Sequence, residues 1–174
     1  NPYCFDSELT WVTWQNTRSS RELTEYVRSL ITFRRTHPIL HGEKTLTGSS
    51  DGGTFPDFSI HGSNAWFASF DQQDRSAGLM FCGKASGAKN PQGRVKEERK
   101  PDEAYVYIAY NFHWEKRELA LPYLPKGRQW HIMIDTSADR FLKEARPVEE
   151  TGEREEAEVK TVTVPGRTVY VLTG

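Results

Sequence analysis

The sequence predicts a mainly β protein, an antiparallel β-sandwich preceded by a single amphipathic helix. Three observations support this fold class. Apolar residues recur with a helical period near the N-terminus, over residues 19–36. Beyond Gly42 they alternate with a period of two, as in half-buried strands. Short polar or glycine-containing turns separate the alternating segments, which is typical of antiparallel sheets.

The helix is predicted to cover residues 19–36. Ser19 and Glu22 have the spacing of a capping box, in which each side chain bonds a backbone N–H that the helix start leaves free. Arg34 lies in the last turn, where a cation interacts favourably with the helix dipole, and Pro38 prevents continuation. Residues spaced three and four apart form one apolar stripe: Leu23, Tyr26, Val27, Leu30 and Ile31.

This apolar stripe needs another element to cover it. Helices bury such faces against a neighbouring layer because apolar side chains are unfavourable in water. No element is predicted before the helix, and nearly everything after it is predicted to be β. We therefore expect the chain to be the C-terminal part of a larger protein, beginning just before the last helix of a barrel or layer.

The segments after the helix are predicted to form short strands. These strands span residues 65–70, 78–82, 105–112, 117–121, 129–135, 159–164 and 168–172. The clearest strand, 105–112, carries one apolar face formed by Val106, Ile108, Tyr110 and Phe112. In strand 129–135, one face is formed by Trp130, Ile132 and Ile134. Residues 84–101 and the acidic run 149–158 are predicted to be loops.

Charge and cysteine content narrow the class of function. The chain has 23 Lys and Arg against 24 Asp and Glu, which argues against a nucleic-acid or membrane-surface partner. No apolar run is long enough to cross a bilayer. Cys4 and Cys82 fit neither a CxxC motif nor a disulfide framework, so we expect reduced thiols and a cytoplasmic protein. The histidines lack metal-binding spacing, and no metal or other cofactor is predicted.

The loop before the helix is the candidate binding site, because it joins aromatic and acidic side chains. Aromatic faces stack on sugar rings, and carboxylates accept hydrogen bonds from sugar hydroxyls. The candidate glycan-contacting residues are Tyr3, Asp6, Glu8 and Trp11. A structural alternative is that Trp11 and Trp14 pack beneath the helix while Asp6 caps a turn. Residue types alone favour this structural alternative over the glycan contact.

Several motifs, taken in order, carry a resemblance to a known family. Residues 1–11 (NPYCFDSELTW) resemble a loop that follows the last strand of a catalytic (β/α)8 barrel, and residues 30–39 (LITFRRTHPI) resemble the closing barrel helix. Residues 57–62 (DFSIHG) and 110–115 (YNFHWE) are similar to later segments of the same proteins. The family is that of isoamylase-type glycogen debranching enzymes, in the α-amylase superfamily.

The resemblance implies a division of the chain and a function. Residues 1–38 would be the last βα loop and closing helix of the catalytic barrel, and residues 39–174 the C-terminal β-sandwich. The parent would hydrolyse α-1,6 branches of glycogen or a related α-glucan with carboxylates on earlier barrel strands, which this chain lacks. The chain itself would then be non-catalytic, with a structural role and a place at the substrate rim.

Two further expectations concern partners and alternatives. Without the barrel, the helix at 19–36 is expected to pair with a second copy of the chain and form a homodimer. A different class of function is a stand-alone β-sandwich that binds carbohydrate without hydrolysing it. A third is a scaffold domain with no ligand.

Overall fold

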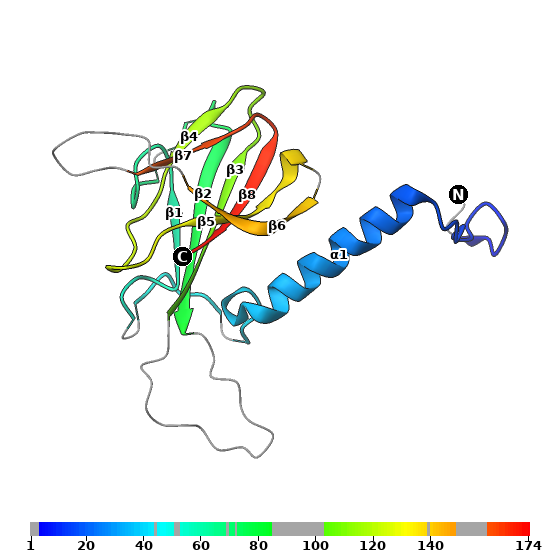
Figure 1. The fold of residues 1–174 in the computed structure, drawn as a ribbon, viewed down its shortest axis with the longest axis horizontal. Helices are drawn as coiled ribbons and strands as arrows, with labels where there is room; N and C mark the ends of the chain where they lie inside the picture. Colours follow the sequence, from blue (N-terminus) through cyan, green and yellow to red (C-terminus); the bar gives the residue numbers. More distant parts are fainter. Residues whose placement is uncertain are drawn as a thin grey trace, which may run out of the picture.

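The computed structural model describes residues 4–43, 45–50, 53–68, 70–71, 73–84, 103–138, 140–148 and 160–174. Within these ranges the chain forms one α-helix followed by strands, with two short 3-10 turns, η2 (Pro38–Leu40) and η3 (Thr136–Ala138). Figure 1 shows the helix extending away from the strands, which lie together in one part of the molecule. The predicted order of one helix followed by a mainly β region is confirmed.

The helix, α1 (Arg18–Thr36), begins one residue earlier than predicted. Its N-cap is Thr17, whose side chain accepts a hydrogen bond from the Ser20 N–H at 3.2 Å. The capping box of Ser19 and Glu22 is therefore wrong, since Ser19 already lies inside the first turn. Glu22 instead accepts a hydrogen bond from Arg18 Nε at 2.8 Å, an exposed i,i+4 pair.

The strands of the described residues form two antiparallel sheets. The larger sheet has the order β1-β2-β3-β8-β5-β6. Its members are β1 (Phe58–His61), β2 (Ser76–Lys84), β3 (Glu103–Asn111), β8 (Thr168–Thr173), β5 (His131–Asp135) and β6 (Arg140–Pro147). The smaller sheet pairs β4 (Arg117–Ala120) with β7 (Thr161–Val164) and packs against one face of the larger sheet. The antiparallel sandwich is confirmed, although its two layers are unequal.

The strand predictions differ from the structure at three places. Residues 65–70 do not form a strand: Asn64 and Phe67 make an isolated bridge, and Trp66 between them has a φ of 64°. Strands β1 and β6 were not predicted. β1 has only four residues, too few for its alternation to stand out, and β6 is an edge strand in which charged residues interrupt the apolar ones without a regular alternation.

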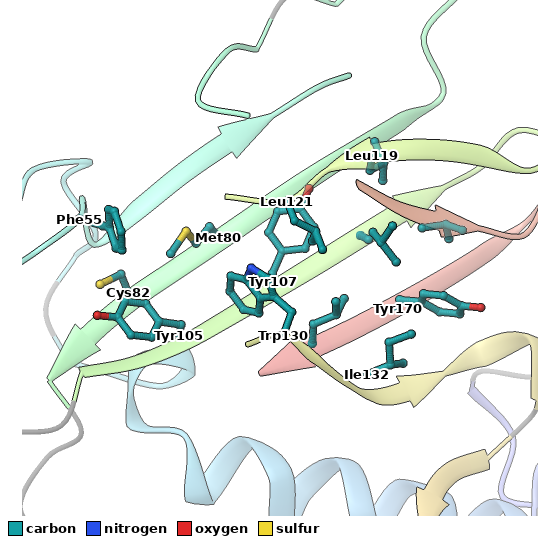
Figure 2. Close-up of a cluster of buried hydrophobic side chains, with 14 residues drawn as sticks. Phe55, Met80, Cys82, Tyr105, Tyr107, Leu119, Leu121, Trp130, Ile132 and Tyr170 are labelled. Atoms are coloured by element: carbon teal, nitrogen blue, oxygen red, sulfur yellow. The ribbon is translucent and has the colours of Figure 1, made fainter. Parts of the chain in front are cut away.

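The main core lies between the two sheets, and Tyr107 of β3 stands near its centre (Figure 2). Tyr107 is fully buried, and its hydroxyl donates to the Ala120 carbonyl of β4 at 2.9 Å. Trp130 closes another part of this core by donating from Nε1 to the Pro122 carbonyl at 2.8 Å. Both rings thus bury a large apolar area while their polar atoms remain hydrogen-bonded.

The outer face of the larger sheet is apolar as well. Val106 and Ile108 of β3 lie on this face, where they pack with residues of α1, η2 and β5. Farther along β3, Tyr110 is half-buried, and beyond its end Phe112 is 65% exposed. An antiparallel sheet with one solvated face normally carries polar residues on that face. The outer face of the larger sheet is therefore apolar enough to pack against a further element, in addition to α1 and η2.

The apolar stripe of α1 is largely uncovered. Near the C-terminal end of the helix Phe33 is buried against the outer face of the larger sheet. Toward the N-terminus Leu23 is 62% exposed and Ile31 is 53% exposed. The view in Figure 1 agrees, since α1 meets the strands at its C-terminal end and then points away from them.

Candidate functional site

The predicted site lies on the loop that precedes α1. A turn at Ser7 holds this loop, with the Thr10 N–H donating to the Ser7 carbonyl at 2.9 Å. The Thr10 hydroxyl also donates to the Phe5 carbonyl at 2.7 Å. Across this turn, Trp11 Nε1 donates to Asp6 Oδ1 at 2.6 Å. The loop thus orients one carboxylate against the edge of one indole ring.

Of the four predicted site residues, the structure brings two together. Asp6 and Trp11 are hydrogen-bonded, and Glu8 lies exposed on the same turn. Tyr3 lies outside the described residues. Trp11 is 58% exposed and Trp14 is 91% exposed, so the alternative in which both indoles pack beneath the helix is wrong.

A second group of aromatic residues was not predicted as a site, and it lies beside β1. Trp66 follows a short turn after His61, and the backbone N–H of Trp66 donates to His61 Nδ1 at 2.8 Å. The Phe55 and Trp66 rings stack with their centroids 5.1 Å apart. The turn-forming run Gly-Ser-Asn at 62–64 lies just before Trp66 in the sequence, but it does not indicate that Trp66 packs against Phe55.

The first residue of the motif at 57–62, Asp57, has a structural role. The Asp57 carboxylate accepts hydrogen bonds from the backbone N–H of Thr47 at 2.9 Å and of Gly48 at 2.7 Å. Burial acts to raise the pKa of Asp57, but these hydrogen bonds outweigh it and hold that pKa below its usual range. Asp57 therefore fastens the segment before β1 while it remains ionised.

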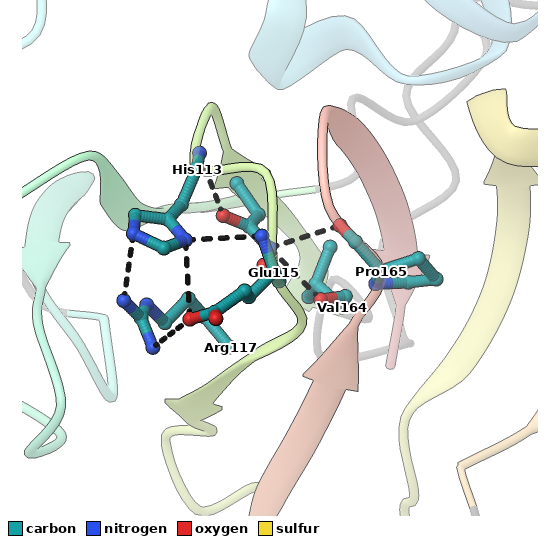
Figure 3. Close-up of polar contacts among 6 residues, drawn as sticks. His113, Glu115, Arg117, Val164 and Pro165 are labelled. Atoms are coloured by element: carbon teal, nitrogen blue, oxygen red, sulfur yellow. Dashed lines mark hydrogen bonds and ion pairs between the residues drawn. The ribbon is translucent and has the colours of Figure 1, made fainter.

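A polar cluster at the end of β3 contains His, Glu and Arg side chains, as a reactive centre would, but its contacts connect β3 to β7 (Figure 3). Asn111 is fully buried, and its Nδ2 donates to the carbonyls of Val164 at 3.0 Å and Pro165 at 2.9 Å. Its Oδ1 accepts from the His113 N–H at 3.0 Å. Arg117 Nη2 lies 2.9 Å from His113 Nε2. The amide of Asn111 is thus fully used in tying β3 to the end of β7.

The described residues limit the other kinds of site. Among them, no group of three or more His, Cys, Asp or Glu side chains could hold a metal ion. The same residues include no helix with the length and apolar character needed to cross a membrane. On the outer face of the larger sheet lies an open groove of about 390 Å³, lined by residues that include Phe70, Arg75, Leu79, Tyr110 and Phe112.

Comparison with known proteins connects this geometry to a family. Residues 96–174 match the model of the alpha amylase, C-terminal all-beta domain. The chain is 26% identical to an isoamylase of Pseudomonas amyloderamosa over 136 residues, 78% of this chain and 15% of the relative. It is 24% identical to the glycogen operon protein GlgX homolog of Mycobacterium bovis over 149 residues, 79% of this chain and 19% of the relative.

A shorter match is closer in sequence. Over 43 residues, 25% of this chain and 6% of the relative, it is 51% identical to a glycogen debranching enzyme of Pectobacterium carotovorum. The chain therefore spans less than a fifth of the length of these curated relatives. Residues 96–174 are accordingly similar to the α-amylase C-terminal all-β domain, and the chain is similar over most of its length to an isoamylase and to a glycogen operon protein GlgX homolog.

Proposed function

We propose that this chain is the C-terminal region of a glycoside hydrolase that cleaves α-1,6 branches in glycogen or a related α-glucan. In this proposal residues 1–38 supply the last βα loop and closing helix of the catalytic barrel, and residues 39–174 form the C-terminal sandwich. The names of the relatives, isoamylase and glycogen debranching enzyme, support the choice of reaction and substrate. The role of the chain is then structural, and the catalytic carboxylates come from the barrel.

The uncovered stripe of α1 is the observation that carries this proposal. Burial of a large apolar side chain is worth roughly 1.5–3 kcal/mol, so exposure of several on one helix is costly. Leu23, Val27 and Ile31 are all exposed, whereas Phe33 at the end of the same helix is buried. A barrel that packs along α1 and onto the outer face of the larger sheet would cover both apolar surfaces at once.

The proposal is tested by comparing the 174-residue chain with the whole protein that its gene encodes. We expect the whole protein to release reducing ends from glycogen and the chain alone to release none. In the same assay, Asp6→Ala in the whole protein tests the loop of Tyr3, Asp6, Glu8 and Trp11 as a rim of the glycan cleft. Loss of one charge-assisted contact predicts a decrease of about tenfold in kcat/KM.

The matched control for the loop is Leu9→Ala, because Leu9 is 91% exposed on the same turn and offers no hydrogen bond through its side chain. Its kinetics should equal those of the unmodified protein. Hydrolysis by the isolated chain, or no hydrolysis by the whole protein, would contradict the proposed function. Equal kinetics for Asp6→Ala and Leu9→Ala would contradict the rim role alone.

For the isolated chain, we propose that the apolar stripes of two helices meet and form a homodimer. Sedimentation velocity of the 174-residue chain should then give a concentration-dependent dimer. Leu30→Asp places a charge in the stripe and should make the chain monomeric, whereas Ser19→Asp, at an exposed position in the first turn, should leave the dimer intact. A chain that stays monomeric at high concentration would contradict this proposal.

We also propose a cytoplasmic location. Cys4 is exposed and Cys82 is buried, and no disulfide joins these two described residues. Cysteines outside disulfides are typical of proteins in reducing compartments, which supports this location.

A further inference from the structure

Three aromatic rings form a structured patch, here called the aromatic platform, which consists of Phe55, Trp66 and Tyr123. Phe55 is 5% exposed, Trp66 37% and Tyr123 66%, so a buried ring supports two rings that reach the surface. The Phe55 centroid lies 5.1 Å from that of Trp66, in a stacked arrangement, and 5.1 Å from that of Tyr123, edge to face. The Trp66 and Tyr123 planes meet at 55°, with their centroids 5.8 Å apart.

The backbone holds Trp66 in place at an energetic cost. Its φ of 64° lies in the left-handed region, which is unfavourable for a residue with a side chain. The backbone N–H of Trp66 donates to Nδ1 of His61, a side chain that is fully buried. His61 Nε2 in turn lies 2.8 Å from Ser59 Oγ. This chain of contacts fixes the position of an indole ring that remains partly in water.

The surroundings of the platform determine which ligand class it suits. The three platform residues carry no charge, and no Asp, Glu, Lys or Arg occurs in residues 58–70 or 119–125. Asp57, two residues from Phe55, is bound by the backbone N–H groups of Thr47 and Gly48. Arg128 lies over the ring of Tyr105, on the core side of Phe55. His61 is buried, and burial lowers its pKa, so it adds no charge at neutral pH. The patch therefore offers ring faces, an indole N–H and a phenol without a net charge. These features suit a neutral, hydroxyl-rich ligand, and they give no attraction to phosphate groups.

The platform is also placed so that it stays accessible. Phe55 belongs to the core between the two sheets, on the inner side of the larger sheet. The buried end of α1 belongs to the cluster on the outer side. A partner that covers α1 and the outer face would therefore leave the platform free.

We infer that the aromatic platform binds an α-glucan chain, with sugar rings stacking on Trp66 and Tyr123. The choice of an α-glucan among neutral sugars rests on the proposed function. The angle between the two exposed rings suits consecutive sugar units of a curved chain better than a flat apolar surface. The contacts that hold Trp66 against His61 and Phe55 then keep the platform ordered before the ligand arrives, which reduces the entropic cost of binding.

The experiment is native gel electrophoresis of the 174-residue chain in gels with and without glycogen. Glycogen should retard the unmodified chain. Tyr123→Ala should weaken the apparent affinity about tenfold, which corresponds to the loss of one aromatic stacking partner. Trp66→Gly should have a similar effect, and glycine adopts a φ of 64° without strain, so this variant keeps the backbone path.

The matched control is Phe67→Ala, since Phe67 is 62% exposed in the same loop but does not belong to the platform. Its retardation should equal that of the unmodified chain. Absence of retardation for the unmodified chain would overturn the inference, and so would equal retardation of Tyr123→Ala and Trp66→Gly. Debranching by the whole protein without such retardation refutes the platform alone. Retardation without debranching by the whole protein refutes the proposed hydrolase and leaves a carbohydrate-binding domain.

Discussion

Replacement of Gly78 by alanine is expected to lower the free energy of unfolding by about 3 kcal/mol, because it overpacks the core and displaces a buried hydrogen bond. Gly78 lies in β2, and a Cβ at this position would stand 1.7 Å from Tyr107 Oη and 2.3 Å from Tyr107 Cζ. The ring cannot give way easily, since it packs against Trp130 and donates its hydroxyl proton to Ala120. Urea unfolding of the variant measures the change.

Gly42→Ala is the control for this prediction. The nearest atom to a Cβ at Gly42 is the Pro38 carbonyl oxygen at 3.8 Å, an ordinary contact. This variant should unfold within about 0.5 kcal/mol of the unmodified chain. A Gly78→Ala chain as stable as Gly42→Ala would show that the Tyr107 ring can move without loss, and that the contact between the sheets is less tightly packed than described.

The sequence predicted the fold class because its two periodicities are unambiguous. The helical period at 19–36 and the alternation in 105–112 each fit a single kind of element. The prediction of which strand face points into the core between the two sheets was weaker, because it depended on alternation alone. Both faces of β3 are apolar, with Tyr107 on the inner face and Ile108 on the outer face, so the period does not reveal which face meets the second sheet.

Local irregularities account for other differences. A bulge between Ile132 and Ile134 shifts the register of β5. Ile132 consequently joins the core between the sheets, whereas Ile134 joins the outer cluster, although the alternation placed them on one face. The strand predicted at 65–70 is wrong for a similar reason, because the left-handed backbone of Trp66 cannot be inferred from its aromatic character.

The glycan-contact role of the candidate loop stays a prediction, and its geometry could not be read from the sequence. The type of residues in the loop indicated a sugar contact, but the hydrogen bond between Asp6 and Trp11 depends on a turn at Ser7 that residue type alone does not define. The aromatic platform was not found, because Phe55, Trp66 and Tyr123 are far apart in the sequence and meet through tertiary packing. Sites assembled from distant segments leave no local pattern that sequence reasoning can use.

Acid is expected to destabilise the fold through His61 by about 3 kcal/mol between pH 7 and pH 4. Burial lowers the pKa of His61 from 6.5 to about 4. The unfolded chain then binds this proton near pH 6.5, and the folded chain binds it near pH 4. The contribution to stability is fully present above pH 6.5, falls as the pH drops from 6.5 to 4, and does not change further below 4.

The contacts of His61 explain why the folded state resists protonation. Nδ1 accepts the Trp66 N–H, so a proton on Nδ1 would break that hydrogen bond and place two donors against each other. The titratable ring packed against His61 is Tyr107, 5.8 Å away, whose pKa burial raises, so Tyr107 stays neutral and offers no compensating charge. Protonation should therefore release Trp66 from its strained backbone, and binding of glycogen by the platform should weaken over the same pH range.

The measurement is urea unfolding from pH 7 to pH 4 of the unmodified chain, His61→Gln and His41→Gln. His61→Gln should be less stable at pH 7, and its stability should fall about 3 kcal/mol less on acidification than that of the unmodified chain. His41 is exposed, so His41→Gln should keep the full pH dependence. Because the other titrating groups are common to all three chains, their contribution cancels in the comparison. Parallel pH profiles for the unmodified chain and His61→Gln would mean that His61 does not stay neutral in the folded state, and that a neutral imidazole is not what holds Trp66 in place.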